Sequence, residues 1–328
     1  MKPFFLKLLF VFFLLKITAI QAQYTDVINS NKPGLSESPY AVGLGVYQVE
    51  SNFFLRNTDT KTTFSNPQSY GADLLFRTSF LREKLEFNGQ LIYQRDQFAF
   101  DNVFKSEQSA SGVSKFSLGA KYLLYQPTYT DKSKEVRSWK RRNAFDKKRL
   151  LPSIAIYGGL NTGFVNEVYV QGGLSPKAGI LLQQNLSRDF NVISNVFYDR
   201  IGTNFEEISY IITATQNFGS RWSGFLEHQG IFQEHQNNAN IGAGLAYLFS
   251  KDFQINTSAR FILEGINPGF VLGFGVSYRI DKHDDGYSKS KEKKQKGQKY
   301  KGKDSAMDAY YKKENSFLNR LMNLFRRK

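Results

Sequence analysis

Apolar and polar residues alternate with a period of two along most of the chain, from about residue 43 to residue 280. The clearest segment is the last one, in which every second residue is large and apolar: Phe270, Leu272, Phe274, Val276, Tyr278 and Ile280. Successive side chains of a β-strand point to opposite faces, so this pattern predicts strands with one apolar face and one face of small or polar residues. Residues 84–94 and 252–261 repeat the pattern.

Twelve segments carry this alternation, and most are longer than the ~5–6 residues typical of strands in a soluble sandwich. Alternation over roughly ten residues, with polar residues inside and apolar residues outside, is typical of a barrel strand in lipid. The sequence therefore predicts an all-β fold, a single antiparallel transmembrane β-barrel of about 12 strands, with a soluble β-sandwich as the alternative. The expected strands are residues 43–55, 69–80, 84–95, 112–125, 152–160, 176–186, 190–199, 207–217, 222–231, 239–249, 253–263 and 270–280.

The connections between these strands are of two kinds that alternate along the chain. Tight polar turns are expected at residues 81–84, 186–190, 218–222 and 249–253, and longer connections at 96–111, 161–175, 232–238 and 264–269. Outer-membrane barrels have short periplasmic turns and longer outer loops. An even number of strands places both termini on the periplasmic side, together with the long connection 126–151.

The first 22 residues are expected to be a secretory signal peptide. Lys2 opens a short basic region, residues 4–20 are almost wholly apolar, and Ala22 supplies a small residue at the cleavage point. Such a run without a stop-transfer flank is typical of an export signal, and an uncleaved helical anchor is the alternative. The chain contains no cysteine, so we expect neither disulfides nor a lipid-modified N-terminus. Residues 23–42 then form an N-terminal segment long enough to fold into the lumen as a plug.

Positive charge is concentrated in two segments of the chain. The formal net charge is +15; residues 131–149 contain nine Lys and Arg against three acids, and residues 281–328 contain fifteen against seven. Residues 281–305 are poor in apolar residues, so we expect a disordered basic C-terminal tail. Residues 315–327 place apolar side chains on one helical face among basic ones, which predicts a short amphipathic helix near the end of the tail.

Both basic segments are candidates for contact with a partner or a membrane surface. An exported chain does not meet nucleic acid, so the expected partners are outer-membrane lipid and, at the tail, a periplasmic protein, peptidoglycan or anionic phospholipid; a solvated tail without a partner is the alternative. The candidate residues are Arg137, Lys140, Arg141, Arg142, Phe317, Leu321, Phe325, Arg326 and Arg327.

The polar face of the strands supplies the candidates for lining the lumen. These residues share the inward parity: Asp73, Arg77, Glu86, Asn88, Gln90, Lys121, Gln183, Arg260 and Arg279. They either line a path for a polar solute or pair with one another in a filled interior, because a barrel of twelve strands lies between the filled and the open sizes.

Residues 32–39 have the sequence KPGLSESP, and Gln48 and Glu50 follow in the pattern G-x-x-Q-x-E. In these residues the chain resembles the outer-membrane barrel family associated with transport in the phenol-degradation (meta-cleavage) pathway. Asn31 stands where members of that family carry an acid, and residues 150–155 are similar to the mid-barrel strand of the family. The resemblance covers about residues 24–280 and implies an outer-membrane barrel with a loosely assigned transport role.

No motif of enzyme chemistry stands out. Glu227-His228 and Glu234-His235 are seven residues apart, which places the two histidines on opposite faces of a continuing strand, so no metal site is expected. Ser209 or Ser223 near His228 is the only hint of a hydrolase, without a specific arrangement. We therefore expect no enzymatic activity and no cofactor. The sequence predicts an outer-membrane transporter or pore for a small solute; the alternative is a structural or docking barrel that recruits a periplasmic partner or secretion machinery through its basic loop and tail.

Overall fold

The structure is a computed structural model that describes residues 27–58, 68–100, 106–129, 138, 145–170, 173–234, 237–264 and 268–282. The chain divides into two units, Met1–Lys282 and His283–Lys328, and all the described residues lie in the first. The expected signal peptide, most of the basic segment 131–149 and the expected C-terminal helix lie outside the described residues.

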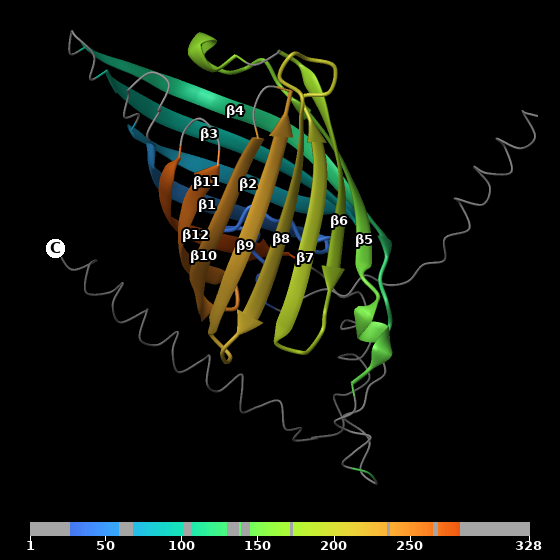
Figure 1. Ribbon diagram of the computed structural model, residues 1–328. Coiled ribbons are helices and arrows are strands. Elements are labelled where there is room, and N and C mark those ends of the chain that lie inside the picture. Colours follow the sequence, from blue (N-terminus) through green and yellow to red (C-terminus); the bar gives the residue numbers. More distant parts are fainter. Residues whose placement is uncertain are drawn as a thin grey trace, which may run out of the picture. The chain divides into compact units, whose positions relative to one another are not determined.

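Twelve antiparallel strands form one closed barrel, in the ring order β1-β12-β11-β10-β9-β8-β7-β6-β5-β4-β3-β2 (Figure 1). The expected all-β fold and number of strands are confirmed. The strands are β1 (Val46–Thr58), β2 (Gln68–Arg82), β3 (Leu85–Phe100), β4 (Ser106–Tyr125), β5 (Ser153–Asn161), β6 (Ser175–Gln184), β7 (Phe190–Asp199), β8 (Glu207–Asn217), β9 (Trp222–Gln233), β10 (Asn237–Ser250), β11 (Phe253–Glu264) and β12 (Gly269–Asp281).

Two short 3-10 helices complete the regular structure of the described residues, η1 (Lys147–Leu150) and η2 (Glu167–Tyr169). Among the described residues, no helix is long and apolar enough to cross a membrane. The ring closes because β1 pairs with β12 over its whole length, from Val46 opposite Asp281 to Thr58 opposite Gly269. Closure gives every strand of the ring a partner strand on each side, so the barrel has no edge strand, which a bilayer would not tolerate.

The two faces of the wall follow the alternation of the sequence. In β12, Phe274 and Tyr278 point outward and are 54% and 52% exposed, whereas Ser277 and Arg279 point into the lumen and are buried. The outer surface is therefore apolar and the lumen polar, the reverse of a soluble protein. This arrangement suits a barrel surrounded by lipid.

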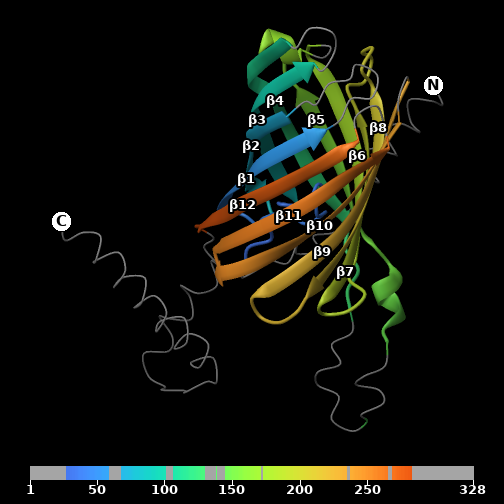
Figure 2. The same ribbon diagram turned by 60° about the vertical axis from the view of Figure 1, so that its left-hand side comes forward.

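The two ends of the barrel differ (Figure 2). We call the end with connections 83–84, 126–152, 185–189, 218–221 and 251–252 the turn end; β1 begins there and β12 ends there. The opposite end, with connections 59–67, 101–105, 162–174, 200–206, 234–236 and 265–268, is the loop end.

The prediction of an outer loop at residues 96–111 was wrong at both of its ends. β3 continues to Phe100 and β4 begins at Ser106, and the ladder pairs Asp96 with Ala110 and Phe100 with Ser106. Backbone pairing continues here although the alternation of apolar and polar residues fades. A strand that projects beyond the apolar band is no longer required to present an apolar face.

Candidate functional site in the barrel lumen

The turn-end half of the lumen contains a buried network of four charged side chains from β1 to β4. Arg77 donates from Nη1 to Glu50 Oε1 and from Nε to Glu86 Oε1, each at 2.8 Å. Lys121 Nζ lies 3.0 Å from Glu86 Oε1. All four side chains are 0% exposed. Buried charges persist only when they are paired and hydrogen-bonded, and here two cations face two carboxylates.

The N-terminal segment, residues 27–45, lies inside the barrel and is held by carboxylates of the wall, those of the buried network and Glu227. Glu50 Oε2 accepts hydrogen bonds from the backbone N–H groups of Asn31 and Lys32, each at 2.8 Å. Glu227 of β9 accepts from the backbone N–H of Leu35 at 2.9 Å. A loop inside a lumen cannot pair its backbone with a sheet, so these carboxylates satisfy its N–H groups instead.

Other strands hold the second half of the N-terminal segment. Asn195 of β7, opposite β1 in the ring, accepts from the backbone N–H of Glu37 at 2.7 Å and donates to its carbonyl at 2.9 Å. Glu86 Oε2 accepts from the backbone N–H of Val42 at 2.9 Å. Because β1, β3, β7 and β9 all contact it, the segment crosses the lumen instead of following one wall.

Side chains of the N-terminal segment add further contacts. Ser38 Oγ donates to Gln183 Oε1 at 2.8 Å, and Lys121 Nζ donates to the Ser38 carbonyl at 2.8 Å. Lys32 forms an ion pair with Asp73. The segment also has an apolar contact, because Leu35 and Tyr40 pack against a cluster of buried inward residues: Leu123, Ala155, Tyr157, Leu181, Phe197 and Ile211.

The two parts of the sequence motif contact each other. Gln48 Nε2 donates to the Asn29 carbonyl at 3.0 Å and to Glu50 Oε1 at 2.7 Å, so the first strand binds the backbone just before residues 32–39. Asn31 Oδ1 accepts from the backbone N–H of Ser38 at 3.3 Å, which closes the segment on itself. An acid at position 31 would retain this acceptor.

The structure places the lumen candidates as follows. Arg77, Glu86 and Lys121 belong to the buried network, and Gln90 Nε2 donates to Asp73 at 2.9 Å. At the turn end, Arg279 Nε donates to Asp252 Oδ1 at 2.9 Å. All of the following side chains have at least one polar partner in the lumen or at its rim: Asp73, Arg77, Glu86, Asn88, Gln90, Lys121, Gln183, Arg260 and Arg279.

Sequence reasoning did not identify Glu227 and Asn195 as lumen residues. Glu227 was considered only as the neighbour of His228, yet it also accepts a hydrogen bond from Arg260 Nη2 at 2.9 Å. Strand parity could have identified both, since each is a polar residue on the inward parity of its strand.

The serines and the histidine considered for hydrolase chemistry lie on opposite faces of the barrel wall. Ser209 and Ser223 have the inward parity, whereas His228 stacks on Tyr210 on the outward parity. No group of three His, Cys, Asp or Glu side chains in the described part of the chain could hold a metal ion. The nine candidates for a partner or membrane surface, from Arg137 to Arg142 and from Phe317 to Arg327, lie outside the described residues.

The loop-end half of the lumen has a different character. Asp199 accepts from Asn161 Nδ2 at 2.6 Å, and Lys177 Nζ lies 3.7 Å from it. Tyr169 of η2 covers the side of this region, and its hydroxyl donates to the Ala110 carbonyl at 3.3 Å. Burial and the neighbouring Asp96 carboxylate raise the pKa of Tyr169 to about 12.

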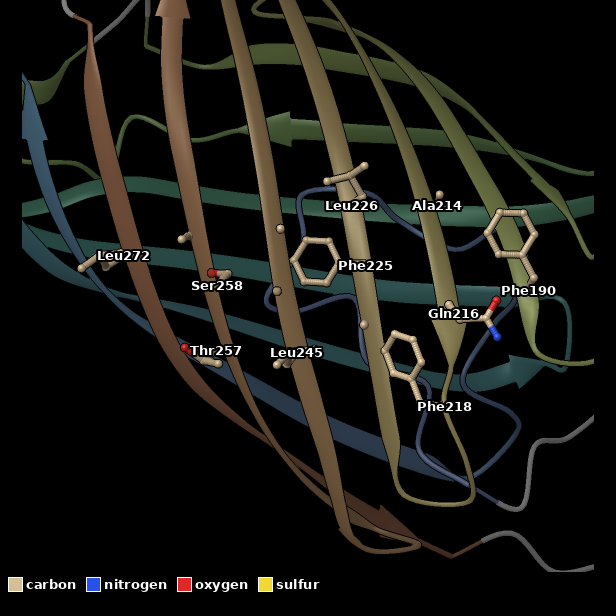
Figure 3. A pocket seen from close by; sticks show the side chains of 14 residues that line it. Phe190, Ala214, Gln216, Phe218, Phe225, Leu226, Leu245, Thr257, Ser258 and Leu272 are labelled. Carbon is tan, nitrogen blue, oxygen red and sulfur yellow. The ribbon is translucent and has the colours of Figure 1, made fainter.

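A hollow of about 610 Å³ lies on the outer wall, over β7 to β12 (Figure 3). Small residues such as Ala243 and Ala259 form its floor, and exposed Leu226, Leu245 and Leu272 stand around it. The surface of the hollow is almost wholly apolar, and most of its lining residues are on the outward parity of their strands, so lipid chains would fill it. The candidate functional site is therefore the lumen, not this hollow.

A family model described as "Putative MetA-pathway of phenol degradation" matches residues 30–280. The chain belongs to this family. The match begins within the N-terminal segment and ends in β12, so the family unit contains both the barrel and the loop inside it. No curated protein sequence matches this family member.

Solved barrels resemble this family member in fold. An outer-membrane channel from Pseudomonas putida F1 is 11% identical with a TM-score of 0.51, and the match covers 76% of this chain and 99% of that chain. The KdgM porin is 8% identical with a TM-score of 0.44, covering 71% and 99%. The CymD monoaromatic hydrocarbon channel is 9% identical with a TM-score of 0.41, covering 74% and 90%. The first of these likenesses supports the outer-membrane barrel fold.

Proposed function

We propose that this protein is an outer-membrane channel for a small solute, and that its N-terminal segment occupies the turn-end half of the lumen and controls passage. The observation that carries the proposal is the set of hydrogen bonds from residues 27–45 to Glu50, Glu86, Asn195 and Glu227. A barrel with a purely structural role has no need to hold a separate loop across a polar lumen. Membership of the family and the channel-like fold support the same function.

The turn end faces the periplasm in this proposal. Four of the five connections at this end are short turns, as on the periplasmic side of outer-membrane barrels, and the chain enters β1 and leaves β12 there. The connection 126–152 is the long exception. Ile28 N donates to the Lys251 carbonyl at 2.8 Å, which brings the start of the described segment to a turn at the same end. The segment therefore enters the lumen from the periplasmic side.

A reversible lock on the N-terminal segment tests the proposal. Ser30 Oγ and Ser277 Oγ are 2.7 Å apart, and the chain has no cysteine, so the double variant Ser30→Cys/Ser277→Cys offers a single disulfide between the segment and β12. In planar bilayers we expect the oxidised protein to conduct less than the reduced protein. A variant lacking residues 27–42 should conduct several-fold more than the full chain.

The single variants Ser30→Cys and Ser277→Cys are the controls, since neither can form the disulfide. Conductance that is equal in the oxidised, reduced and deletion proteins would refute control by the segment. Absence of conductance from every variant, each shown to be folded by its heat-modifiable gel mobility, would refute the channel itself.

A further inference from the structure

A second cavity lies in the loop-end half of the lumen, on the other side of the N-terminal segment from the turn end. Its volume is about 280 Å³. Its lining comes from β1, β3, β4, β5, the β5–β6 connection and the β7–β8 turn: Arg56, Ile92, Gln94, Ser114, Lys115, Phe116, Asn161, Thr162, Val165, Tyr169, Gly173 and Arg200. Three of these residues are cationic and none is acidic.

The cations at this cavity are only partly compensated. Lys115 and Lys177 share one carboxylate, with their Nζ atoms 4.0 Å and 3.7 Å from Asp199 Oδ2. Arg200 Nη1 lies 3.3 Å from Glu207 Oε2. Arg56 has no ion pair and no hydrogen bond to any residue that the structure describes; its guanidinium lies over the Phe54 ring, 5.5 Å from the centroid. The cavity therefore has a guanidinium available for an added anion.

A count of the charged side chains around the cavity also indicates an excess of positive charge. Four cations, Arg56, Lys115, Lys177 and Arg200, face three carboxylates, Asp96, Asp199 and Glu207, and the neighbouring Arg260 is paired with Glu227, so one positive charge is in excess. The Asp96 carboxylate already accepts from Gln94 Nε2 at 2.9 Å. Asp96 acts on Arg56 without forming a direct ion pair with it. A partly desolvated cation without such a pair raises the free energy of the empty site, and a monoanion would lower it.

The backbone is shaped to bring these cations to the cavity. Ser114 is an extra residue in β4, so Val113 pairs with Tyr93 while Lys115 pairs with Ile92. Because of this bulge, Val113 and Lys115 face opposite sides of the wall, and Lys115 points into the lumen. Arg200 has a φ of +54°, a conformation that non-glycine residues rarely adopt.

The rest of the lining is of mixed polarity. Ile92 and Val165 supply apolar surface, Tyr169 adds an aromatic ring, and Gln94 and Thr162 add amide and hydroxyl groups. Inorganic phosphate or chloride would leave the apolar surface without a partner. A carboxylate on a compact apolar body would match both parts, with its charge toward Arg56 and Lys115.

We propose that this loop-end cavity is a binding subsite for a small organic monoanion with an apolar body, held by Arg56 and Lys115. The proposal rests on the proposed function and deepens it. It names the class of solute that binds in the loop-end half of the lumen and then passes the N-terminal segment. Arg56 makes the charge-assisted hydrogen bonds, Lys115 adds a second positive charge, and the apolar surface selects against fully hydrated ions.

Calorimetric titration of the full chain in detergent tests the subsite, with benzoate as the probe. Benzyl alcohol has nearly the same shape without the charge, and benzylamine carries the opposite charge. We expect benzoate to bind and both analogues to bind at least tenfold more weakly. Arg56→Gln and Lys115→Gln should each weaken benzoate binding about ten- to hundredfold, the range expected for one charge-assisted hydrogen bond. Lys115→Arg should retain most of the affinity.

Arg95→Gln is the matched control, because Arg95 is exposed on the outward parity of β3 next to Gln94. It removes the same charge at the same end of the barrel and should leave benzoate binding unchanged. Equal binding of benzoate and benzyl alcohol, or unchanged benzoate binding in both cavity variants, would overturn the subsite. A chain that conducts in bilayers without binding benzoate would overturn the subsite and leave the channel function intact. A chain that binds benzoate without conducting would overturn the channel function and leave the subsite intact.

Discussion

Glu50, Glu86 and Glu227 show at the scale of single residues how a loop is kept inside a barrel. Each is buried, each points inward from a different strand, and each accepts from backbone N–H groups of residues 27–45. An ionised carboxylate is the strongest acceptor available to an amide N–H. Arg77 compensates two of these charges at once, so it links the wall of the barrel to the attachment of the segment.

Replacement of Arg77 by methionine should therefore destabilise the protein strongly. Arg77→Met leaves Glu50 and Glu86 buried with one cation fewer, which we expect to lower the free energy of unfolding by about 3–5 kcal/mol. Urea titration in detergent micelles, followed by tryptophan fluorescence, measures the change. Arg82→Met, at the exposed end of the same strand, is the control and should change stability little. An unchanged unfolding midpoint for Arg77→Met would contradict the role given to this network.

The strands are the part of the structure that the sequence predicted best. Their number and most boundaries follow from the alternation of residues such as Phe274 and Ser277, because lipid demands an apolar outer face along the whole membrane-spanning length. The extensions to Phe100 and from Ser106 could not be predicted from that alternation, since apolar and polar residues no longer alternate there although the backbone stays paired. The bulge at Ser114 could not be predicted from the sequence either. One inserted residue is recognised only from the pairing register with the neighbouring strand, where Val113 pairs with Tyr93 and Lys115 with Ile92.

Strand glycines allow a test of packing at this scale, because two of them meet opposite surroundings. A Cβ added at Gly275 would lie 2.2 Å from the Ser51 carbonyl oxygen and 2.6 Å from Asn256 Oδ1, so the backbone would have to shift. We expect Gly275→Ala to cost about 1–3 kcal/mol of unfolding free energy. Gly158, exposed on the outer face, has no atom within 4 Å of such a Cβ. Gly158→Ala should be neutral or slightly stabilising. The same urea titration measures the unfolding free energy of both variants. Equal losses in Gly275→Ala and Gly158→Ala would show that the close contact at Gly275 does not cause the destabilisation.

At the scale of the whole molecule, the position of the N-terminal segment was only partly predictable. The Pro and Gly content of residues 23–42 was compatible with a plug, and KPGLSESP marked the segment as distinctive. The residues that hold it, Asn195 and Glu227 among them, are far away in sequence and converge only because the sheet closes into a ring. The cations of the loop-end cavity converge for the same reason, so no local pattern reveals that cavity.

The sidedness of the barrel is the remaining property of the whole molecule, and the absence of cysteine makes it directly measurable. Thr203→Cys places a thiol in the connection between β7 and β8 at the loop end, and Arg188→Cys places one between β6 and β7 at the turn end. If the turn end faces the periplasm, a membrane-impermeant maleimide added to whole cells should label Thr203→Cys and not Arg188→Cys. Permeabilising the outer membrane should then expose both, which shows that each thiol is reactive. Labelling of Arg188→Cys alone in intact cells would reverse the orientation, and the N-terminal segment would then enter the lumen from the outside.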